Sequence, residues 1–168
     1  MRVLVTGGSG YLGSAIVRSL VRHGHEPIAF ARRASSAGLP GRAVDGDIRD
    51  RTAVLQAARG AQAICHAAAL VAAWASRPGD FDDINVGGLE AVIEAARSLG
   101  IPRIVYTSSF LAWPRTGGVA PRRMQDYQRT KIRARELAQV RGSLGRADRL
   151  DGDAAGVNGA GNRGQGPR

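Results

Sequence analysis

The chain has 168 residues, of which 43% are hydrophobic and 23% are charged, and its formal net charge at pH 7 is +10. This length suits a single domain with a real core, and the composition excludes a wholly disordered or collagen-like chain. No apolar run approaches the roughly 18 residues of a membrane span, and the first residues lack the pattern of a secretory signal. We therefore expect a cytoplasmic protein with no membrane partner. The single cysteine, Cys65, excludes an internal disulfide and a multi-cysteine metal site, so no metal is expected.

The basic charge would also suit a nucleic-acid-binding protein. The arginines are scattered along the chain, however, and there is no helix-turn-helix, zinc-finger or aromatic-interleaved RNA-binding pattern. We therefore expect no specific nucleic-acid partner. An arginine-rich nucleic-acid binder stays an alternative, and its affinity would fall steeply with salt.

The first part of the chain alternates short β-branched runs with longer Ala-, Arg- and Glu-rich segments, as βαβ units do. Apolar spacings of three and four residues mark the helical segments. The pattern predicts an α/β domain over residues 1–138, a Rossmann-type doubly wound parallel sheet with strand order 3-2-1-4-5, truncated after its fifth strand and one further helix. The expected strands are 2–6, 27–31, 42–44, 63–66 and 103–107, and the expected helices are 11–23, 51–59 and 81–99.

The composition changes at residue 139. Eight of the last thirty residues are glycine, none is aromatic, and no strand-like run is present. Such a stretch cannot bury enough apolar surface to offset its ordering entropy. We expect residues 139–168 to be a disordered Gly/Arg-rich tail, or the product of a truncated or frame-disrupted gene.

A glycine loop is the first chemical signal. The run Thr6-Gly7-Gly8-Ser9-Gly10-Tyr11-Leu12-Gly13 follows the first predicted strand and opens the first predicted helix. Glycines there permit a tight turn and let backbone amides approach a pyrophosphate, and the helix N-terminus favours the anion. The loop predicts a dinucleotide site made by Gly7, Gly10, Tyr11, Leu12 and Gly13.

The residues after the second predicted strand bear on the choice of cofactor. A cofactor without a 2′-phosphate usually takes a carboxylate there, on its ribose hydroxyls, but this chain has Arg32 and Arg33. Two arginines can clamp a 2′-phosphate. We therefore favour NADP over NAD. Two solvated loop arginines are the open alternative.

A Tyr-x-x-x-Lys pair, Tyr127 and Lys131, falls on a predicted helical segment, where residues four apart share a face. Lys131 is the only lysine among the 24 Lys and Arg residues. Tyrosine is a weak base at neutral pH, and a neighbouring compact ammonium group favours its phenolate. The pair therefore indicates proton transfer by Tyr127, supported by Lys131.

With the glycine loop and this pair, four short stretches of residues 1–138 resemble the extended short-chain dehydrogenase/reductase family, which holds NAD(P)-dependent epimerases, dehydratases and dihydroflavonol-reductase-like enzymes. They are Gly46-Asp47-Ile48, His66-Ala67-Ala68-Ala69, Asn85-Val86-Gly87-Gly88 and Tyr106-Thr107-Ser108-Ser109.

The resemblance implies a role for each of these stretches. Asp47 and Ile48 lie at the adenine, His66 with Ala67 and Ala68 lets the backbone lie against the cofactor, and Asn85 steadies the neighbouring strand. Ser109, with Ser108 as the alternate, polarises the substrate oxygen. For the Tyr-Lys pair, the resemblance implies that Tyr127 and Lys131 also bind the cofactor, with Lys131 hydrogen-bonding the nicotinamide ribose.

We therefore expect an NAD(P)-dependent oxidoreductase in which hydride passes to or from a carbonyl or alcohol carbon and Tyr127 moves the proton. A sugar-nucleotide epimerase/dehydratase and a dinucleotide-binding protein without turnover stay open. The expected partners are a small-molecule substrate and, as one option, a second copy in a homo-oligomer. Trp74 and Trp113 are expected in the core more than in a substrate pocket.

Overall fold

The computed structural model describes residues 1–71, 77, 79–113 and 125–141. At its centre is a parallel sheet of five strands in the order β3-β2-β1-β4-β5. The strands are β1 (Arg2–Thr6), β2 (Glu26–Ala31), β3 (Arg42–Asp45), β4 (Ala63–His66) and β5 (Ile104–Tyr106). The predicted fold class and strand order are confirmed, and each strand end lies within one residue of its predicted place.

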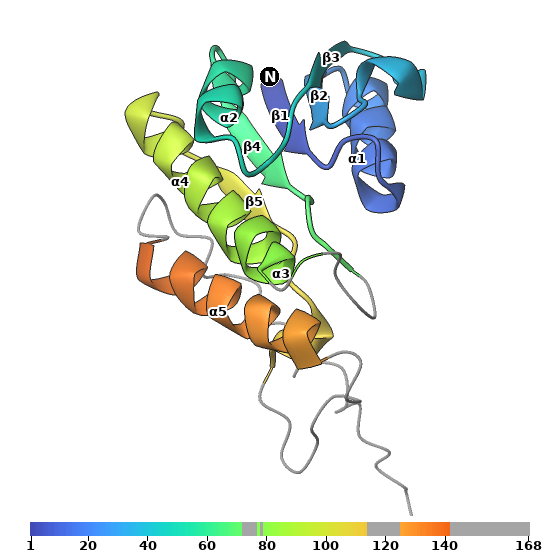
Figure 1. The fold of residues 1–168 in the computed structure, drawn as a ribbon. Coiled ribbons are helices and arrows are strands. Elements are labelled where there is room, and N and C mark those ends of the chain that lie inside the picture. The colour runs from blue at the N-terminus through green and yellow to red at the C-terminus, as the bar shows by residue number, and fades with distance from the viewer. Residues whose placement is uncertain (72–76, 78, 114–124, 142–168) are drawn as a thin grey trace, which may run out of the picture.

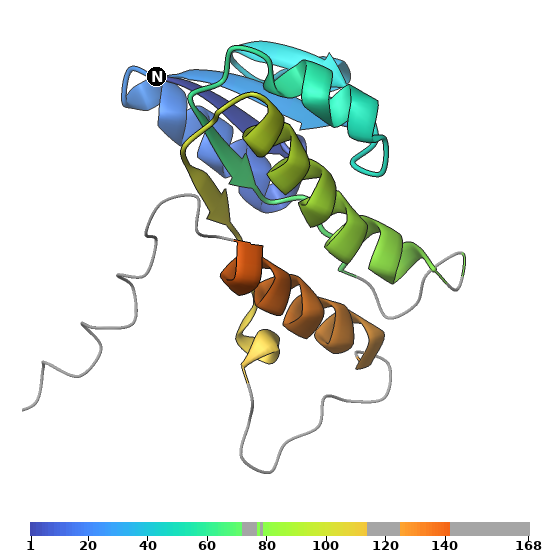
Figure 2. The same ribbon diagram turned by 90° about the vertical axis from the view of Figure 1, so that its left-hand side faces the viewer.

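Helices cover both faces of the sheet. Helix α1 (Tyr11–Arg22) lies on one face, and α2 (Arg51–Ala58) and α4 (Gly88–Ser98) lie on the other (Figure 1). Helix α5 (Gln125–Arg141) runs alongside α4, and the short turn η3 (Phe110–Ala112) packs against α5 (Figure 2). A further short turn, η1 (Ser35–Ala37), lies between β2 and β3.

The two faces of the sheet carry different core residues, because successive side chains of a strand point to opposite faces. Leu4, Ile28 and Ile64 pack under α2 and α4, while Val3, Val5 and Ala29 pack against Val17 of α1. All of these side chains are buried. Parallel strands covered on both faces have continuous apolar runs, as in β1, β2 and β4, whereas the edge strands β3 and β5 are partly exposed.

The helix expected over 81–99 is interrupted. It consists of a single turn, α3 (Asp80–Asp82), a π-helical turn, η2 (Asp83–Gly87), and α4. Two adjacent glycines, Gly87 and Gly88, weaken the helical preference at this point. A Cβ at Gly88 would lie 2.8 Å from the Ile48 side chain, so the glycine allows α4 to approach the segment after β3.

Asn85, in the π-helical turn, joins three parts of the fold. Its side chain accepts a hydrogen bond from Leu70 N (2.7 Å) and donates to Leu70 O (3.2 Å) and to Thr130 Oγ1 (3.0 Å). It thereby ties the segment after β4 to α5, as expected for the asparagine that steadies the neighbouring strand.

Strand β5 is the edge strand, and among the described residues it pairs only with β4. Val105 in its centre is 54% exposed. Helix α5 continues to Arg141, three residues past the predicted boundary at 138, and residues 142–168 of the predicted tail lie outside the described residues. The division into domain and tail stays a prediction. No helix in the described part of the chain is long and apolar enough to cross a membrane.

Candidate functional site

The glycine loop lies where β1 meets α1, and close backbone contacts determine its shape. Gly7 has a φ of +69°, which favours glycine, and a Cβ on it would lie 2.8 Å from the backbone of Ala68. A Cβ on Gly13 would overlap the carbonyl oxygen of Gly7. These two positions therefore need glycine if the loop is to turn back over the ends of β1 and β4.

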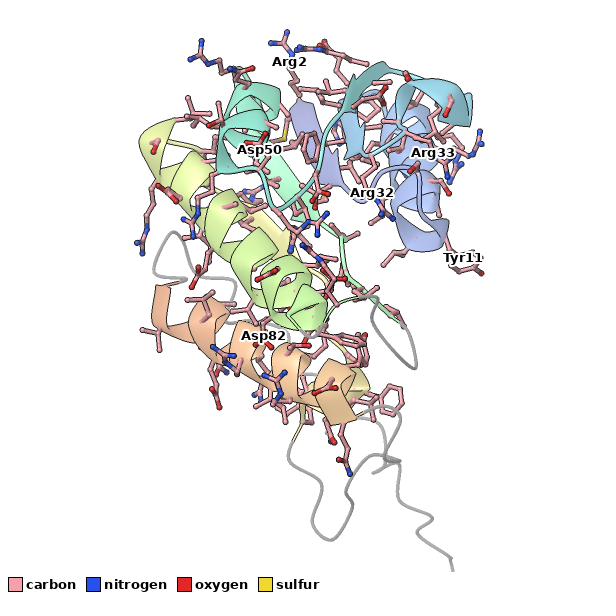
Figure 3. The ribbon with its side chains drawn as sticks, in the orientation of Figure 1. Arg2, Tyr11, Arg32, Arg33, Asp50 and Asp82 are labelled. Carbon is pink, nitrogen blue, oxygen red and sulfur yellow. The ribbon has the colours of Figure 1, made fainter. Side chains whose placement is uncertain are left out.

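The loop presents the N-terminus of α1 without a side-chain cap. Gly10 occupies the cap position with no side-chain hydrogen bond, and the first turn of α1 has no acidic residue. The first amides of a helix have no partner within the helix, and together with the helix dipole they favour an anion. Tyr11, in this first turn, is 99% exposed and projects away from the sheet (Figure 3).

A cavity of about 700 Å³ opens at the carboxyl ends of the strands. Ligands of open α/β sheets bind at this edge, where the strand order reverses. The structure brings eight of the predicted cofactor residues to its wall: Gly7, Gly10, Arg32, Arg33, Asp47, Ile48, Ala67 and Ala68.

Arg32 and Arg33 follow β2 directly and are exposed at the rim of the cavity (Figure 3). Neither arginine forms an ion pair with a carboxylate of the described residues. The nearby carboxylate of Asp45 accepts hydrogen bonds from the amide (2.8 Å) and the hydroxyl (2.5 Å) of Ser35 instead. Both guanidinium groups are therefore available to an anionic ligand.

Asp47 lines the cavity, but its carboxylate is already engaged by Arg49. The Arg49 amide and Nε each donate to Oδ1 at 2.9 Å, and a terminal nitrogen donates to Oδ2 at 2.6 Å. These bonds from Arg49 lower the pKa of Asp47, with a smaller effect of the Arg32 charge. Arg49 also reaches Asp80 (3.4 Å), which Arg77 holds in turn (2.8 Å).

Sequence reasoning missed Arg49 and Asp80 as members of this wall. Arg49 had a local signal, because an arginine two residues after an aspartate in a turn can reach its carboxylate. Asp80 had none, since only the tertiary fold brings α3 to this place.

His66 lies at the end of β4 and faces α4, in register with Thr6 on β1 and Tyr106 on β5. Its Nδ1 shares a hydrogen bond with Thr6 Oγ1 (2.7 Å), and Thr6 Oγ1 also accepts from the amide of Ala68 (3.4 Å). His66 is 1% exposed. Burial, with a smaller effect of the Lys131 charge, lowers the pKa of His66 from 6.5 to about 3, so the imidazole is neutral at physiological pH.

Tyr127 and Lys131 lie on one face of α5, as predicted, and both are buried, at 8% and 3% exposure. Lys131 Nζ donates a hydrogen bond to Thr107 O (2.8 Å) just after β5. Burial lowers the pKa of Lys131 from 10.5 to about 8. A buried amine near the carboxyl end of the sheet is therefore close to its titration range at neutral pH.

Ser109 is half-buried and caps the turn η3, where its Oγ accepts from Leu111 N (3.3 Å). Gln128 of α5 donates to Leu111 O (3.3 Å), so η3 is tied to the helix that carries Tyr127 and Lys131. Ser108 is exposed. Ser109, Tyr127 and Lys131 thus gather at the β5 end of the sheet, and none of them lines the cavity beside the glycine loop.

The expectation that Trp113 belongs to the core is wrong. Trp113 is 48% exposed, and the guanidinium of Arg135 lies over its ring, 3.7 Å from the centroid. Trp74 lies outside the described residues.

A parallel sheet of this strand order, with a glycine loop between β1 and α1 and a cavity at the carboxyl edge, defines a dinucleotide-binding protein of the Rossmann type. Residues 3–145 match the model of the NAD dependent epimerase/dehydratase family, and the chain belongs to this family.

The chain is similar to curated proteins of several activities. It is 40% identical over 114 residues to sterol demethylase protein B of Methylococcus capsulatus. The aligned residues cover 66% of this chain and 35% of that protein. It is 41% identical over 115 residues to 2-alkyl-3-oxoalkanoate reductase of Stenotrophomonas maltophilia, 65% of this chain and 33% of the reductase.

Solved structures agree with the family. A short-chain dehydrogenase/reductase superfamily protein from Agrobacterium tumefaciens with bound NAD matches with a TM-score of 0.72 and 27% identity, over 86% of this chain and 46% of that one. UDP-glucose 4-epimerase of Thermus thermophilus in complex with NAD matches with a TM-score of 0.71 and 28% identity, over 84% of this chain and 51% of the epimerase. The chain thus spans about a third of these curated relatives and about half of these solved ones.

The buried neutral His66 predicts a specific acid sensitivity. As pH falls from about 6.5 toward about 3, the unfolded state takes up a proton that the folded state refuses, so the free energy of unfolding falls. From about pH 7 to about pH 4.5, His66 should lower the free energy of unfolding by about 2 to 3 kcal/mol, at 1.36 kcal/mol per pKa unit. Urea unfolding of the wild type and of His66→Gln should show the difference, because all carboxylates are common to both proteins. An equal pH dependence in the two would contradict the prediction.

Proposed function

We propose that the chain binds a nicotinamide dinucleotide and acts as an NAD(P)-dependent oxidoreductase of the short-chain dehydrogenase type. Hydride is transferred to or from a carbonyl or alcohol carbon. The observation that carries the proposal is the pair of sites at one edge of the sheet. The glycine loop and cavity lie over β1 and β2, and the buried Tyr127 and Lys131 lie at β5.

The residues present fit a dinucleotide. The close approach of Gly7 to Ala68 leaves no space for side chains where a pyrophosphate would meet the backbone, and the uncapped start of α1 offers amides of Tyr11, Leu12 and Gly13. Asp47 and Ile48 would face the adenine. Ala67 and Ala68 would let the cofactor lie close to the backbone after His66. The neighbouring solved proteins that carry NAD support this assignment.

When bound, the dinucleotide supplies or accepts the hydride. Tyr127 moves the proton, as base in oxidation and as acid in reduction, and Lys131 supports its phenolate and hydrogen-bonds the ribose. Ser109 polarises the substrate oxygen. Lys131 is suited to this role because its amine is buried and oriented by Thr107 O.

Two other functions keep support from particular observations. The solved UDP-glucose 4-epimerases with NAD favour a sugar-nucleotide epimerase or dehydratase. The cavity favours a dinucleotide-binding protein without turnover, since none of Ser109, Tyr127 and Lys131 lines it and turnover needs reacting atoms held closely with water excluded.

Dinucleotide binding is the first test of the proposal. Calorimetric titration of the chain with NADH and NADPH should show saturable binding, and Gly13→Ala should weaken it at least about tenfold, because a Cβ there overlaps Gly7 O and moves the loop. Gly24→Ala is the control: its positive φ also strains the backbone, but its Cβ would meet nothing within 4 Å and Gly24 does not line the cavity, so it should leave binding unchanged. The absence of binding by folded wild-type protein would refute the proposal.

Tyr127→Phe tests the chemical step. Carbonyl reduction should fall by about 10² to 10⁴, the usual contribution of a positioned acid or base, while dinucleotide affinity changes little. Steady-state assays with calorimetry on the same samples separate the two effects. Binding without turnover in the wild type would favour the non-catalytic alternative, and an active Tyr127→Phe variant would remove Tyr127 from its role.

Arg32 and Arg33 should decide between the two cofactors. If they clamp a 2′-phosphate, Arg32→Ala with Arg33→Ala should weaken NADPH by about 10- to 100-fold, corresponding to the loss of charge-assisted hydrogen bonds, and should change NADH affinity by less than about threefold. The matched control is Arg59→Ala with Arg103→Ala, two exposed arginines that do not line the cavity. Equal losses for NADPH and NADH in the first pair would refute the clamp.

A further inference from the structure

Lys131 is buried without a carboxylate. Among the described residues no ion pair joins it to an acidic side chain, and its ammonium donates a hydrogen bond to the backbone oxygen of Thr107. Asp82, an acidic residue of the neighbouring α3, pairs with Arg129 and Arg133. An unpaired buried ammonium group is unusual, because burial strongly disfavours its charge.

The face of an aromatic ring stands where a counter-ion would be expected. Lys131 Nζ lies 4.7 Å from the ring centroid of Tyr106, within the range of a cation–π interaction. Among the described residues, the other titratable groups that face Lys131 are His66 on β4 and Tyr127 one turn earlier on α5. Neither is a carboxylate, so the ring face of Tyr106 and the carbonyl oxygen of Thr107 are the negative groups beside the ammonium.

The ring is fixed in place by the sheet. Tyr106 is in register with His66, and the two rings stack with centroids 5.8 Å apart and an angle of 23° between their planes. His66 is in register with Thr6 and shares a hydrogen bond with it at the start of the glycine loop. The paired residues Thr6, His66 and Tyr106 at the ends of β1, β4 and β5 therefore connect the glycine loop to the aromatic ring that contacts Lys131.

The hydroxyl of Tyr106 takes no part in this contact. It is buried and has no hydrogen-bond partner among the described groups. Burial, with a smaller effect of Tyr127, raises the pKa of Tyr106 to about 12. The phenol therefore stays neutral at physiological pH, and it contributes to the contact with Lys131 through its ring.

We propose that Tyr106 is a positioning residue for Lys131, whose ammonium it keeps charged and aimed by presenting the face of its ring, with the stacked His66 as support. The inference deepens the proposed oxidoreductase function and rests on it for the catalytic consequence, which is that the charge of Lys131 supports Tyr127. The contact itself is independent of turnover.

The contact between Lys131 and the Tyr106 ring matters because the pKa of Lys131 is only slightly above physiological pH. Burial lowers the pKa of Lys131 to about 8, so further loss of stabilisation would leave much of the amine neutral at physiological pH. A neutral amine places no positive charge beside the Tyr127 hydroxyl. Removing the ring should therefore act on proton transfer through the charge of Lys131.

The sole lysine of the chain allows a direct test. Protein grown with lysine labelled with ¹³C at the ε position gives one lysine signal, whose chemical shift reports the titration of Lys131. Tyr106→Leu removes the ring and keeps an apolar side chain, and Tyr106→Phe keeps the ring and removes the hydroxyl. We expect the Lys131 pKa to fall by about 0.4 to 1.5 units in Tyr106→Leu, the equivalent of a cation–π interaction, and by less than about 0.3 units in Tyr106→Phe.

A second measurement needs no variant. In the wild type the ε-methylene protons of Lys131 should resonate upfield of those of a lysine in a peptide, because the Nζ bonded to that carbon lies over the face of the Tyr106 ring. Normal shifts in folded protein would overturn the proposal, even if Tyr106→Leu fails to fold. It would also be overturned if Tyr106→Leu titrates as the wild type does, or if Tyr106→Phe falls as far as Tyr106→Leu.

The result also separates this inference from the proposed function. A lowered Lys131 pKa in Tyr106→Leu, together with no dinucleotide binding by the wild type, would keep the contact and reject the function. Dinucleotide binding with an unchanged Lys131 titration would keep the function and reject the contact. Where turnover is measurable, the pH profile of kcat in Tyr106→Leu should shift with the Lys131 pKa, while Tyr106→Phe restores the wild-type profile.

Discussion

The close approach of two backbones, at Gly7 and Ala68, is the constraint on which the site depends. Strands β1 and β4 are neighbours in the sheet, and their chains leave it side by side before one turns into α1 and the other runs on toward α3. A Cβ at Gly7 would force these chains apart. The side chain of Thr6 links the ends of the same two strands through its hydrogen bonds with His66 Nδ1 and Ala68 N. The shape of the cavity thus follows from a backbone contact that side chains would prevent.

Charge at this edge is arranged in two different ways. On the wall of the cavity, Asp47, Arg49 and Asp80 form a chain of alternating sign, which neutralises the arginine nearest to the expected adenine. At the rim, Arg32 and Arg33 have no carboxylate partner among the described residues and keep their positive potential. Since exposed ion pairs contribute little to stability, we interpret the first arrangement as positioning of the wall and the second as attraction of an anion.

The sequence predicted most of the fold because its signals are local. Short, mostly apolar runs indicated the strands, and the positions of Gly7, Gly10 and Gly13 indicated the turn into α1. The π-helical turn at Asn85 could not be predicted, because it depends on a tertiary match between the Asn85 side chain, Leu70 and Thr130. In the candidate site, the spacing of Tyr127 and Lys131 was sufficient to place them on one face. The pairing of Asp47 with Arg49 and the exposure of Trp113 depend on neighbours that no spacing reveals.

The burial of position 131 accounts for a lysine at this place in an arginine-rich chain. Arginines are used here where a charge stays near solvent and can be paired, as in the contacts of Arg129 and Arg133 with Asp82. A guanidinium is large, keeps its charge at every physiological pH and suits planar, bidentate partners. At position 131 the group is buried between a backbone oxygen and an aromatic ring, its charge acts on the imidazole of His66, and no carboxylate in the described part of the chain pairs with it. A compact amine fits that space, and its protonation responds to burial and to the ring, which a guanidinium would not allow.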